Sequence, residues 1–191
     1  MKKLITCFYL ITLSGLSQEI AIDSMKIENL EEVLVSSVRV KNNIPIAYNN
    51  ISKKEISNRN LGQDLPILLN FLPNVVTTSD AGAGIGYTGI RIRGINSQST
   101  NVTINGIPYN DAESLGTFWV DLPDFSSSIE NLQVQRGIGT SVNGSSAFGA
   151  SINILTDKIS DDPYFENSNS IGSYNTLKNT FRFSTGLINE Q

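Results

Sequence analysis

The residues best suited to chemistry are three arginines at the ends of short apolar patterns. Arg91 and Arg93 alternate with Ile90 and Ile92, so a β-strand here would place both guanidinium groups on one face. They would lie about 6–7 Å apart at a rise of ~3.3 Å per residue. Arg136 ends a second alternating run and, like Arg93, precedes a glycine. Because arginine binds carboxylates with a planar fork, a covered arginine face requires carboxylate partners.

Two further patterns suggest a cofactor site or a catalytic site, and we discount both. Gly84, Gly86 and Gly89 match GxGxxG, but dinucleotide binding requires that motif to open a helix. Here it leads into the Ile90 run, so we expect a glycine-rich surface loop. Asp111 and Glu113 form a carboxylate pair of the kind a hydrolase uses, although neighbouring loop acids are usually solvated.

Composition narrows the function classes further. The chain has no histidine, which removes Ser–His and Cys–His pairs and the commonest metal ligand. We therefore expect no enzyme, no catalytic residue, no metal and no cofactor. The formal net charge of −4 also disfavours nucleic acid as a partner, because such binding depends on clustered Lys and Arg.

The N-terminus reads as an export signal. Lys2 and Lys3 precede a mostly apolar stretch, residues 4–16, and the small-x-small tripeptide 15–17 fits a cleavage site. The sequence therefore predicts a signal peptide over residues 1–17, with a short buried helix as the alternative. Cleavage would remove the only cysteine, Cys7, and both lysines, which takes the net charge from −4 to −6. An exported, cysteine-free protein uses no disulfides.

Two helices precede the arginine strand. Ser52 and Glu55 have the spacing of a capping box, which predicts a short helix over Lys53–Asn58. Four leucines then recur at helical spacing and form one apolar stripe that Pro73 ends. We assign these leucines to the core: Leu65, Leu68, Leu69 and Leu72.

Alternating patterns predict the strands. They cover residues 75–78, 90–93, 102–104, 129–136 and 150–154. Asn105-Gly106 predicts a tight turn after the third of them. In the fourth, Leu132 and Val134 should face inward, with Gln133 and Gln135 facing outward.

The C-terminal part has a different pattern. Residues 157–163 read as a polar linker, and residues 166–174 as a polar extended segment. In residues 177–187, Phe181 and Phe183 share one face, with Lys178 and Arg182 on the other. This alternation is typical of a membrane barrel strand, although a strand of an ordinary β-sandwich shows the same pattern.

Four signatures in this order resemble the N-terminal part of a TonB-dependent outer-membrane receptor, of the kind found in Bacteroidetes. They are GIRIRG at 89–94, VTINGIP at 102–108, IENLQVQRG at 129–137, and the stretch from Gly144 through 148–150 to Thr156. The resemblance implies an α+β fold. A small plug domain (44–156) with a mixed β-sheet and short helices would precede the first one or two strands of a transmembrane β-barrel (157–191) that is otherwise absent from the chain.

The resemblance also implies a contact for TonB. Residues 30–37 lie where the family carries its TonB box, inside a flexible N-terminal segment, residues 18–43. TonB would pair with this segment by strand addition, which depends on main-chain hydrogen bonds and tolerates a loose sequence. From the residues alone, the first strand of the domain remains an alternative reading. The expected box residues are Glu32, Val33, Leu34, Val35 and Ser36.

Two further roles follow from the resemblance. Arg91, Arg93 and Arg136 would form ion pairs with carboxylates of the barrel wall. The alternative is pairing within the plug, with one of three acids: Glu130, Asp121 or Asp124. Three aromatic residues on loops would contact the ligand, although burial is equally open for the last two: Tyr87, Phe118 and Trp119.

The implied function is active uptake of an iron chelate, a vitamin or a glycan, with the plug in a barrel lumen of the cell outer membrane and facing the periplasm. Two strands cannot close a barrel, and lipid does not tolerate unpaired strand edges. We therefore expect a fragment or a truncated product that does not transport alone. The alternative is a free-standing periplasmic plug-like module that binds TonB or a ligand.

Overall fold

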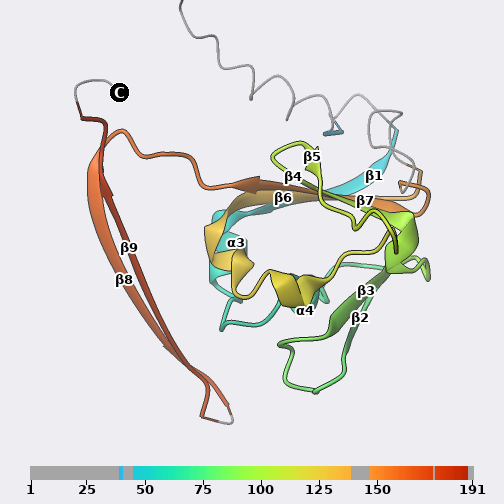
Figure 1. Ribbon diagram of the computed structural model, residues 1–191, viewed down its shortest axis with the longest axis horizontal. Helices are drawn as coiled ribbons and strands as arrows, with labels where there is room; N and C mark the ends of the chain where they lie inside the picture. Colours follow the sequence, from blue (N-terminus) through green and yellow to red (C-terminus); the bar gives the residue numbers. More distant parts are fainter. Residues whose placement is uncertain (1–38, 41–44, 139–146, 174, 189–191) are drawn as a thin grey trace, which may run out of the picture.

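A five-stranded mixed sheet forms the centre of the molecule. The computed structural model describes residues 39–40, 45–138, 147–173 and 175–188. In the sheet order β1-β6-β7-β4-β5, β4 and β7 are parallel and the other neighbours are antiparallel (Figure 1). The strands are β1 (Ala47–Ser52), β4 (Thr100–Ile104), β5 (Ile107–Pro108), β6 (Ile129–Arg136) and β7 (Ala150–Thr156).

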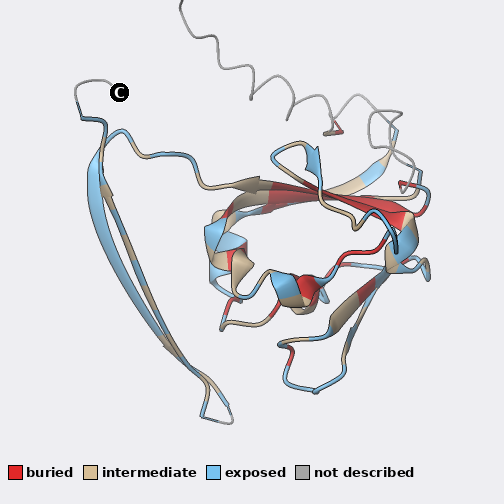
Figure 2. Ribbon diagram, in the orientation of Figure 1, coloured by how far each residue is buried: buried red, intermediate tan, exposed pale blue. Residues whose placement is uncertain are grey.

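Short helices cover the apolar face of this sheet and enclose the core. They are α3 (Lys53–Ser57), α4 (Leu65–Leu68) and three 3₁₀ turns, η2 (Ser97–Ser99), η3 (Trp119–Asp121) and η4 (Phe125–Ser128). Figure 2 shows the buried residues concentrated in the central strands and beneath them. Leu132 of β6 and Ile152 of β7 are fully buried. The mixed sheet with few short helices confirms the predicted α+β class.

The first helix forms as the capping box predicts. The Ser52 backbone N–H donates to Glu55 Oε2 at 2.8 Å, and the Glu55 N–H donates to Ser52 Oγ at 3.4 Å. These bonds satisfy N–H groups that a helix start otherwise leaves unpaired. Because the Ser52 backbone and then its side chain donate to that carboxylate, they lower the pKa of Glu55.

The second helix is shorter than its leucine stripe predicts. It ends at Leu68, and the chain continues through turns in which Leu72 N–H donates to Leu69 O at 3.0 Å. The prediction that Pro73 ends this helix is therefore wrong, because proline restricts only itself and Leu72, and the helix has already ended at Leu68. All four leucines are nonetheless buried in the core, as predicted.

A separate hairpin carries the glycine-rich loop. β2 (Val75–Ser79) pairs antiparallel with β3 (Thr88–Ile92), and the loop between them contains three glycines with positive φ. The loop leads into a strand, which confirms that it is not a dinucleotide-binding turn. Gly84 approaches α4: its amide donates to Ser79 Oγ, and its carbonyl accepts from the Asp64 N–H.

A long hairpin projects from one side of the domain (Figure 1). β8 (Pro163–Ile171) pairs antiparallel with β9 (Leu177–Thr185) and, within the described residues, with no other strand. The predicted alternation in β9 is confirmed, since Phe181 and Phe183 are exposed while Lys178 and Arg182 turn toward the domain. Across the ranges that the structure describes, no helix has the length and apolar character to cross a membrane.

The sheet differs from the sequence prediction in two respects, one strand that was missed and one orientation that was wrong. The first edge strand, β1, was not predicted, because its two asparagines have low strand propensity. Gln133 and Gln135 do not face solvent, and only 2% and 0% of their surfaces are exposed. The second face of the sheet is therefore buried as well, and it is polar.

Candidate functional site

Arg93 lies in a tight turn and not in the strand. The β3 strand ends at Ile92, and Arg93 and Gly94 both have positive φ, 55° and 78°. The Ile95 N–H donates to Ile92 O at 3.0 Å, which closes the turn. The expectation that Arg91 and Arg93 share one strand face is therefore wrong. A two-residue turn of this handedness requires positive φ at both positions, and glycine supplies the second without strain.

The turn brings Arg93 beside Arg136, 43 positions further along the chain. Both side chains line one hollow, together with Gly137 and Gly149. A Cβ built on Gly137 would lie 2.9 Å from Arg93 Nη1, so this guanidinium lies directly over the residue that follows Arg136. Arg136 Nη1 donates to Pro73 O at 3.4 Å.

These arginines lack carboxylate partners in the part of the chain that the structure describes. No Asp or Glu oxygen there lies within 4.0 Å of Arg91, Arg93 or Arg136. The buried Arg136 Nε also has no hydrogen-bond acceptor among those residues. Two cations in one hollow repel each other, so the site favours an anionic partner.

Two of the three acids proposed as partners of the arginines are bound to lysines instead. Glu130 lies 3.6 Å from Lys53 Nζ, and Asp124 lies 2.6 Å from Lys178 Nζ. The structure records no ion pair for Asp121 with any residue that it describes. For Glu130 and Asp124, the alternative of pairing with the arginines is therefore wrong.

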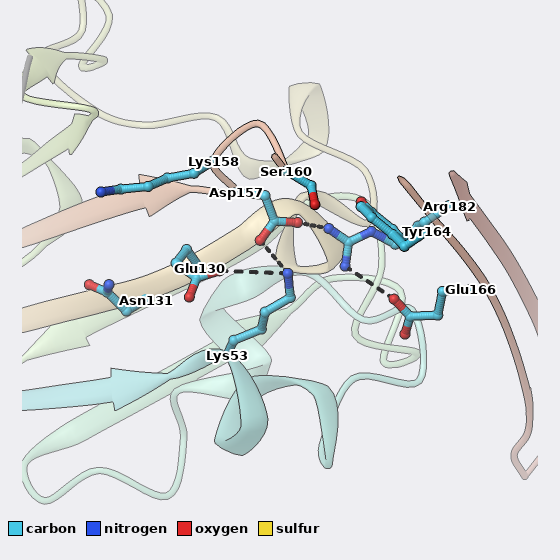
Figure 3. Close-up of a pocket in the computed structure, with 9 residues that line it drawn as sticks. All are labelled: Lys53, Glu130, Asn131, Asp157, Lys158, Ser160, Tyr164, Glu166 and Arg182. Carbon is cyan, nitrogen blue, oxygen red and sulfur yellow. Dashed lines mark hydrogen bonds and ion pairs between the residues drawn. The ribbon is translucent and has the colours of Figure 1, made fainter. Parts of the chain in front are cut away.

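An ion network instead joins the plug to the β8–β9 hairpin (Figure 3). Asp157, which directly follows β7, accepts from Lys53 Nζ at 2.5 Å and pairs with Arg182 of β9. Arg182 Nη1 also lies 3.8 Å from Glu166 of β8. In Figure 3 the side chains of Lys53 and Arg182 converge on Asp157 from the domain and from the hairpin.

A second cation of the hairpin binds the domain nearby. Lys178 Nζ donates to Asp124 Oδ1 at 2.6 Å and to Ser127 Oγ at 2.7 Å. Asn60 Nδ2 donates to the same two oxygens, at 3.2 and 3.0 Å. The Lys178 side chain is only 14% exposed, so this contact is partly shielded from solvent.

Sequence reasoning missed these contacts although a signal was present. It placed Lys178 and Arg182 on the polar face of a barrel strand but sought plug–barrel pairs only for plug arginines. In the structure, the hairpin supplies the cations, and the carboxylates are Asp124 of the domain and Asp157, the first residue after β7. The available signal was the presence of two cations on the polar face of a strand that follows an acid-containing domain. Such cations indicate ion pairs between the strand and the domain.

The three aromatic residues expected on ligand loops have different environments. Tyr87, in the β2–β3 loop, is 68% exposed, and Phe118 is 49% exposed. Trp119 is only 2% exposed and packs in the core, so burial is the correct alternative for this residue. Phe118 has extended backbone geometry as the N-cap of η3, whereas Trp119 is the first residue of that turn. The change of backbone geometry between them accounts for their different exposure.

Asp111 forms hydrogen bonds within its own loop. Its Oδ2 accepts from the Ser114 N–H at 2.6 Å and from the Glu113 N–H at 3.2 Å. Hydrogen bonds from the Ser114 backbone and side chain lower the pKa of Asp111. These bonds favour the ionised form of Asp111, because they donate to its carboxylate.

The expected signal peptide, residues 1–17, and the TonB-box-like segment, residues 30–37, lie outside the described residues. Both remain predictions.

Comparisons with known proteins agree with the fold. The family model described as "TonB-dependent Receptor Plug Domain" matches residues 40–151. The chain is 30% identical over 137 residues to the vitamin B12 transporter BtuB of Vibrio vulnificus (strain YJ016), covering 72% of this chain and 20% of that transporter. It is 25% identical over 146 residues to PirA, a probable TonB-dependent siderophore receptor of Acinetobacter baumannii, covering 71% of this chain and 19% of the receptor.

A solved structure shows the same fold. The ferric yersiniabactin uptake receptor FyuA from Yersinia pestis superposes with a TM-score of 0.56 at 18% identity, covering 76% of this chain and 22% of that receptor. The chain spans about a fifth of the length of the curated relatives it matches. These relatives do not test the Bacteroidetes type, which stays a prediction. The match over residues 40–151, joined to the plug-like sheet, establishes that the chain belongs to the TonB-dependent receptor plug domain family.

Proposed function

We propose that this chain is the plug portion of a TonB-dependent outer-membrane receptor for active nutrient uptake. In this proposal, residues 1–17 direct export, residues 44–156 form the plug, and residues 157–191 begin the wall of a barrel in the cell outer membrane. The plug lies in the barrel lumen and faces the periplasm.

One observation carries this proposal: the orientation of the β8–β9 hairpin. Its apolar side chains, Phe181 and Phe183 among them, point away from the domain and are 66% and 77% exposed. Its cations, Lys178 and Arg182, point toward the domain and bind its carboxylates. A barrel wall that meets lipid outside and a polar plug inside requires the same orientation.

The unpartnered arginines support the same proposal. Arg93 and Arg136 share a hollow without a carboxylate from the described residues, and Arg91 is exposed. We propose that carboxylates of further barrel strands bind them. A bidentate Arg–carboxylate pair in this covered position would fix the plug, and removing one partner from a buried pair typically costs about 3–5 kcal/mol.

The ligand class follows from the relatives and from the two exposed aromatic residues. One relative is described as a vitamin B12 transporter and another as a probable siderophore receptor. We propose an iron chelate or a vitamin as the transported ligand, with a glycan as the third class. Tyr87 and Phe118 are the proposed plug contacts, because both are exposed aromatic side chains on loops.

Two experiments test the transport proposal. Sequencing the DNA past codon 191 should reveal in-frame barrel strands, whereas a stop codon with no barrel downstream would refute transport by this product. Deleting the gene should then abolish growth on one ligand class when iron chelates, cobalamin and glycans are offered separately. Unimpaired growth on all three classes would contradict uptake of these nutrients.

The proposed TonB contact makes a specific prediction. Val33→Pro should abolish TonB pairing, because proline removes a backbone N–H that strand addition requires. Val33→Ala keeps that N–H and is the matched control. Cross-linking to TonB and ligand uptake by the full-length receptor measure the effect, and normal uptake by the Val33→Pro receptor would refute this placement of the box.

A free-standing periplasmic plug-like module remains the second proposal. One observation favours it: the main apolar core cluster extends from Ile51 to Ile154, inside the proposed domain limits of 44–156. The purified segment 44–156 should then be soluble, monomeric and cooperatively folded. Aggregation of that segment would remove the basis of this alternative.

A further inference from the structure

The polar face of the central sheet carries two complete rows of polar side chains. One row crosses all four long strands in register, Asn50–Gln133–Asn153–Thr103, and the next is Tyr48–Gln135–Ser151–Asn101. The six residues of β4, β6 and β7 in these rows are at most 4% exposed. Buried polar side chains require hydrogen-bond partners, which can come from the same sheet or from other parts of the chain.

The chain just before β1 supplies one such partner. The Val40 N–H donates to Gln133 Oε1 at 2.8 Å, and Gln133 Nε2 donates to Val40 O at 3.1 Å. One side-chain amide thus binds both backbone groups of a single residue, as a neighbouring strand would. We call these two hydrogen bonds the Val40 clamp.

Gln133 is held in position for this contact. Its Nε2 also donates to Asn50 Oδ1 at 2.8 Å, and its Oε1 accepts from Gln135 Nε2 at 2.9 Å. Asn50 belongs to the same polar row as Gln133, and Gln135 belongs to the next row. Because Gln133 lies on β6, between β1 and β7, the clamp attaches the N-terminal chain to the interior of the sheet and not to its edge.

The neighbouring residue is held less favourably. Arg39 Nη2 donates to Asn153 O at 3.2 Å, but its buried Nε lacks an acceptor among the described residues. Burial lowers the pKa of Arg39, which reflects the cost of removing a cation from water. Exposure of Arg39 would recover that cost, so the desolvated cation opposes the clamp and favours release.

We propose that the Val40 clamp is a releasable attachment that couples the N-terminal chain to the plug, with Gln133 as its positioning residue. The inference rests on the proposed function in one respect, that TonB pulls on residues 30–37. Since Val40 follows that segment by three residues, tension on it reaches the clamp before it reaches β1. The two hydrogen bonds of the clamp use only the backbone of Val40, whose side chain is also buried.

The test measures release without TonB. In the full-length protein, Arg39→Cys provides a thiol at a half-buried position beside Val40, and the rate at which a maleimide labels this residue reports release of the clamp. Gln133→Met keeps the volume but removes both bonds of the clamp. At about 5-fold per net hydrogen bond, the rate should rise about 25-fold. Thr103→Val, which removes the buried Thr103–Asn153 bond from the same row, should leave the rate unchanged.

A second variant separates release from general loosening. Val40→Pro removes the N–H donated to Gln133 and keeps the carbonyl that accepts from Gln133, although it also changes a buried side chain. Since one bond of the clamp is lost, the rate should rise at least about 5-fold. The proposal is overturned if Gln133→Met and Thr103→Val accelerate labelling equally. It is also overturned if Val40→Pro has no effect, or if the parent protein reacts as fast as the free peptide 30–40.

The proposed function is tested separately in the same proteins. Binding of the TonB C-terminal domain to the free peptide 30–37 does not involve the clamp. Absence of that binding would overturn the TonB contact and leave the labelling result as evidence for the clamp alone. If both proposals hold, Gln133→Met should also raise the yield of cross-linking between TonB and the thiol that Arg39→Cys introduces.

Discussion

At the residue scale, Gly149 shows how closely the chain passes itself beside the arginine hollow. A Cβ built there would lie 2.2 Å from Ile95 Cγ2 and 2.7 Å from Ile95 Cβ. The Gly149 amide donates to Ser99 O, and its carbonyl accepts from the Gly137 N–H, both at 2.8 Å. The chain at Ser99 and the chain at Gly137 are therefore both hydrogen-bonded to Gly149. A side chain at residue 149 would clash with Ile95 and strain these bonds.

Gly149→Ala should consequently destabilise the domain by about 1–3 kcal/mol, the usual cost of overpacking. Gly116→Ala is the matched control, since its Cβ would meet nothing closer than 3.5 Å and its φ is not positive. Denaturant unfolding measures both, and adding Ile95→Ala should recover part of the loss. Equal stabilities of the Gly149→Ala and Gly116→Ala variants would contradict this role.

Asp111 gives a prediction about pH. Its pKa is lowered in the folded state, so its stabilisation is present above its ordinary value of 3.8 and is lost as the pH falls further. Asp111→Asn should therefore lose less stability than the parent between about pH 4 and pH 2. The free energy of unfolding across this window measures the effect. Identical pH slopes in the two proteins would show that the Ser114 and Glu113 hydrogen bonds contribute nothing.

At the scale of elements, the β8–β9 hairpin is attached to the plug through partly buried ion pairs. We expect Lys178 and Asp124 to show a coupling energy of about 1–3 kcal/mol in a double-mutant cycle of Lys178→Met and Asp124→Asn. Thr180 lies on the same face of β9. The control cycle of Thr180→Val with Asp124→Asn should be additive. A Lys178–Asp124 coupling near zero would mean that the contact does not hold the hairpin.

The elements show which features the sequence determines locally. Three features were predictable from local patterns. The alternation of apolar residues gave the bounds of β6, the helical spacing gave the core leucines, and the backbone preference of Asn105-Gly106 gave the turn. The β1 strand was not, because an asparagine-rich edge strand forms only through pairing with β6. Outward placement of Gln133 was wrong for a related reason: its partner, Val40, lies 93 positions away. Contacts at such separations leave no periodic pattern.

At the scale of the whole molecule, the apolar side of the hairpin predicts how the receptor meets lipid. Phe183→Arg should impair membrane assembly, because arginine on the lipid face of a barrel strand costs about 2–4 kcal/mol near the bilayer midplane. Ser184→Arg, on the opposite face of the same strand, is the control. The amount of full-length receptor in the outer-membrane fraction measures both variants. Equal loss from Phe183→Arg and Ser184→Arg would argue against a lipid-facing surface.

The sequence also could not predict which segment supplies the cations of these ion pairs and which supplies the carboxylates. The sequence shows cations on both the plug and the hairpin, and nothing local distinguishes Arg136 from Arg182. Only the fold brings Asp124 and Asp157 to the hairpin while it separates Arg93 and Arg136 from every acid that the structure describes. The candidate site was therefore predictable in its residue types but not in its pairing.

Together, the alternation and the ion pairs of β9 encode the position of the hairpin at two levels. If β9 shifted by one residue, Phe181 would face the domain and Lys178 would face the opposite, apolar side. The polarity of the side chains therefore opposes a shift by an odd number of residues. A slip by two residues keeps every side chain on its proper face, and polarity cannot oppose it. Contacts with specific partners, such as Lys178 with Asp124 and Arg182 with Asp157, distinguish the correct position from one shifted by two residues. In the proposed receptor, the domain would thus fix the position of the first hairpin of the barrel wall.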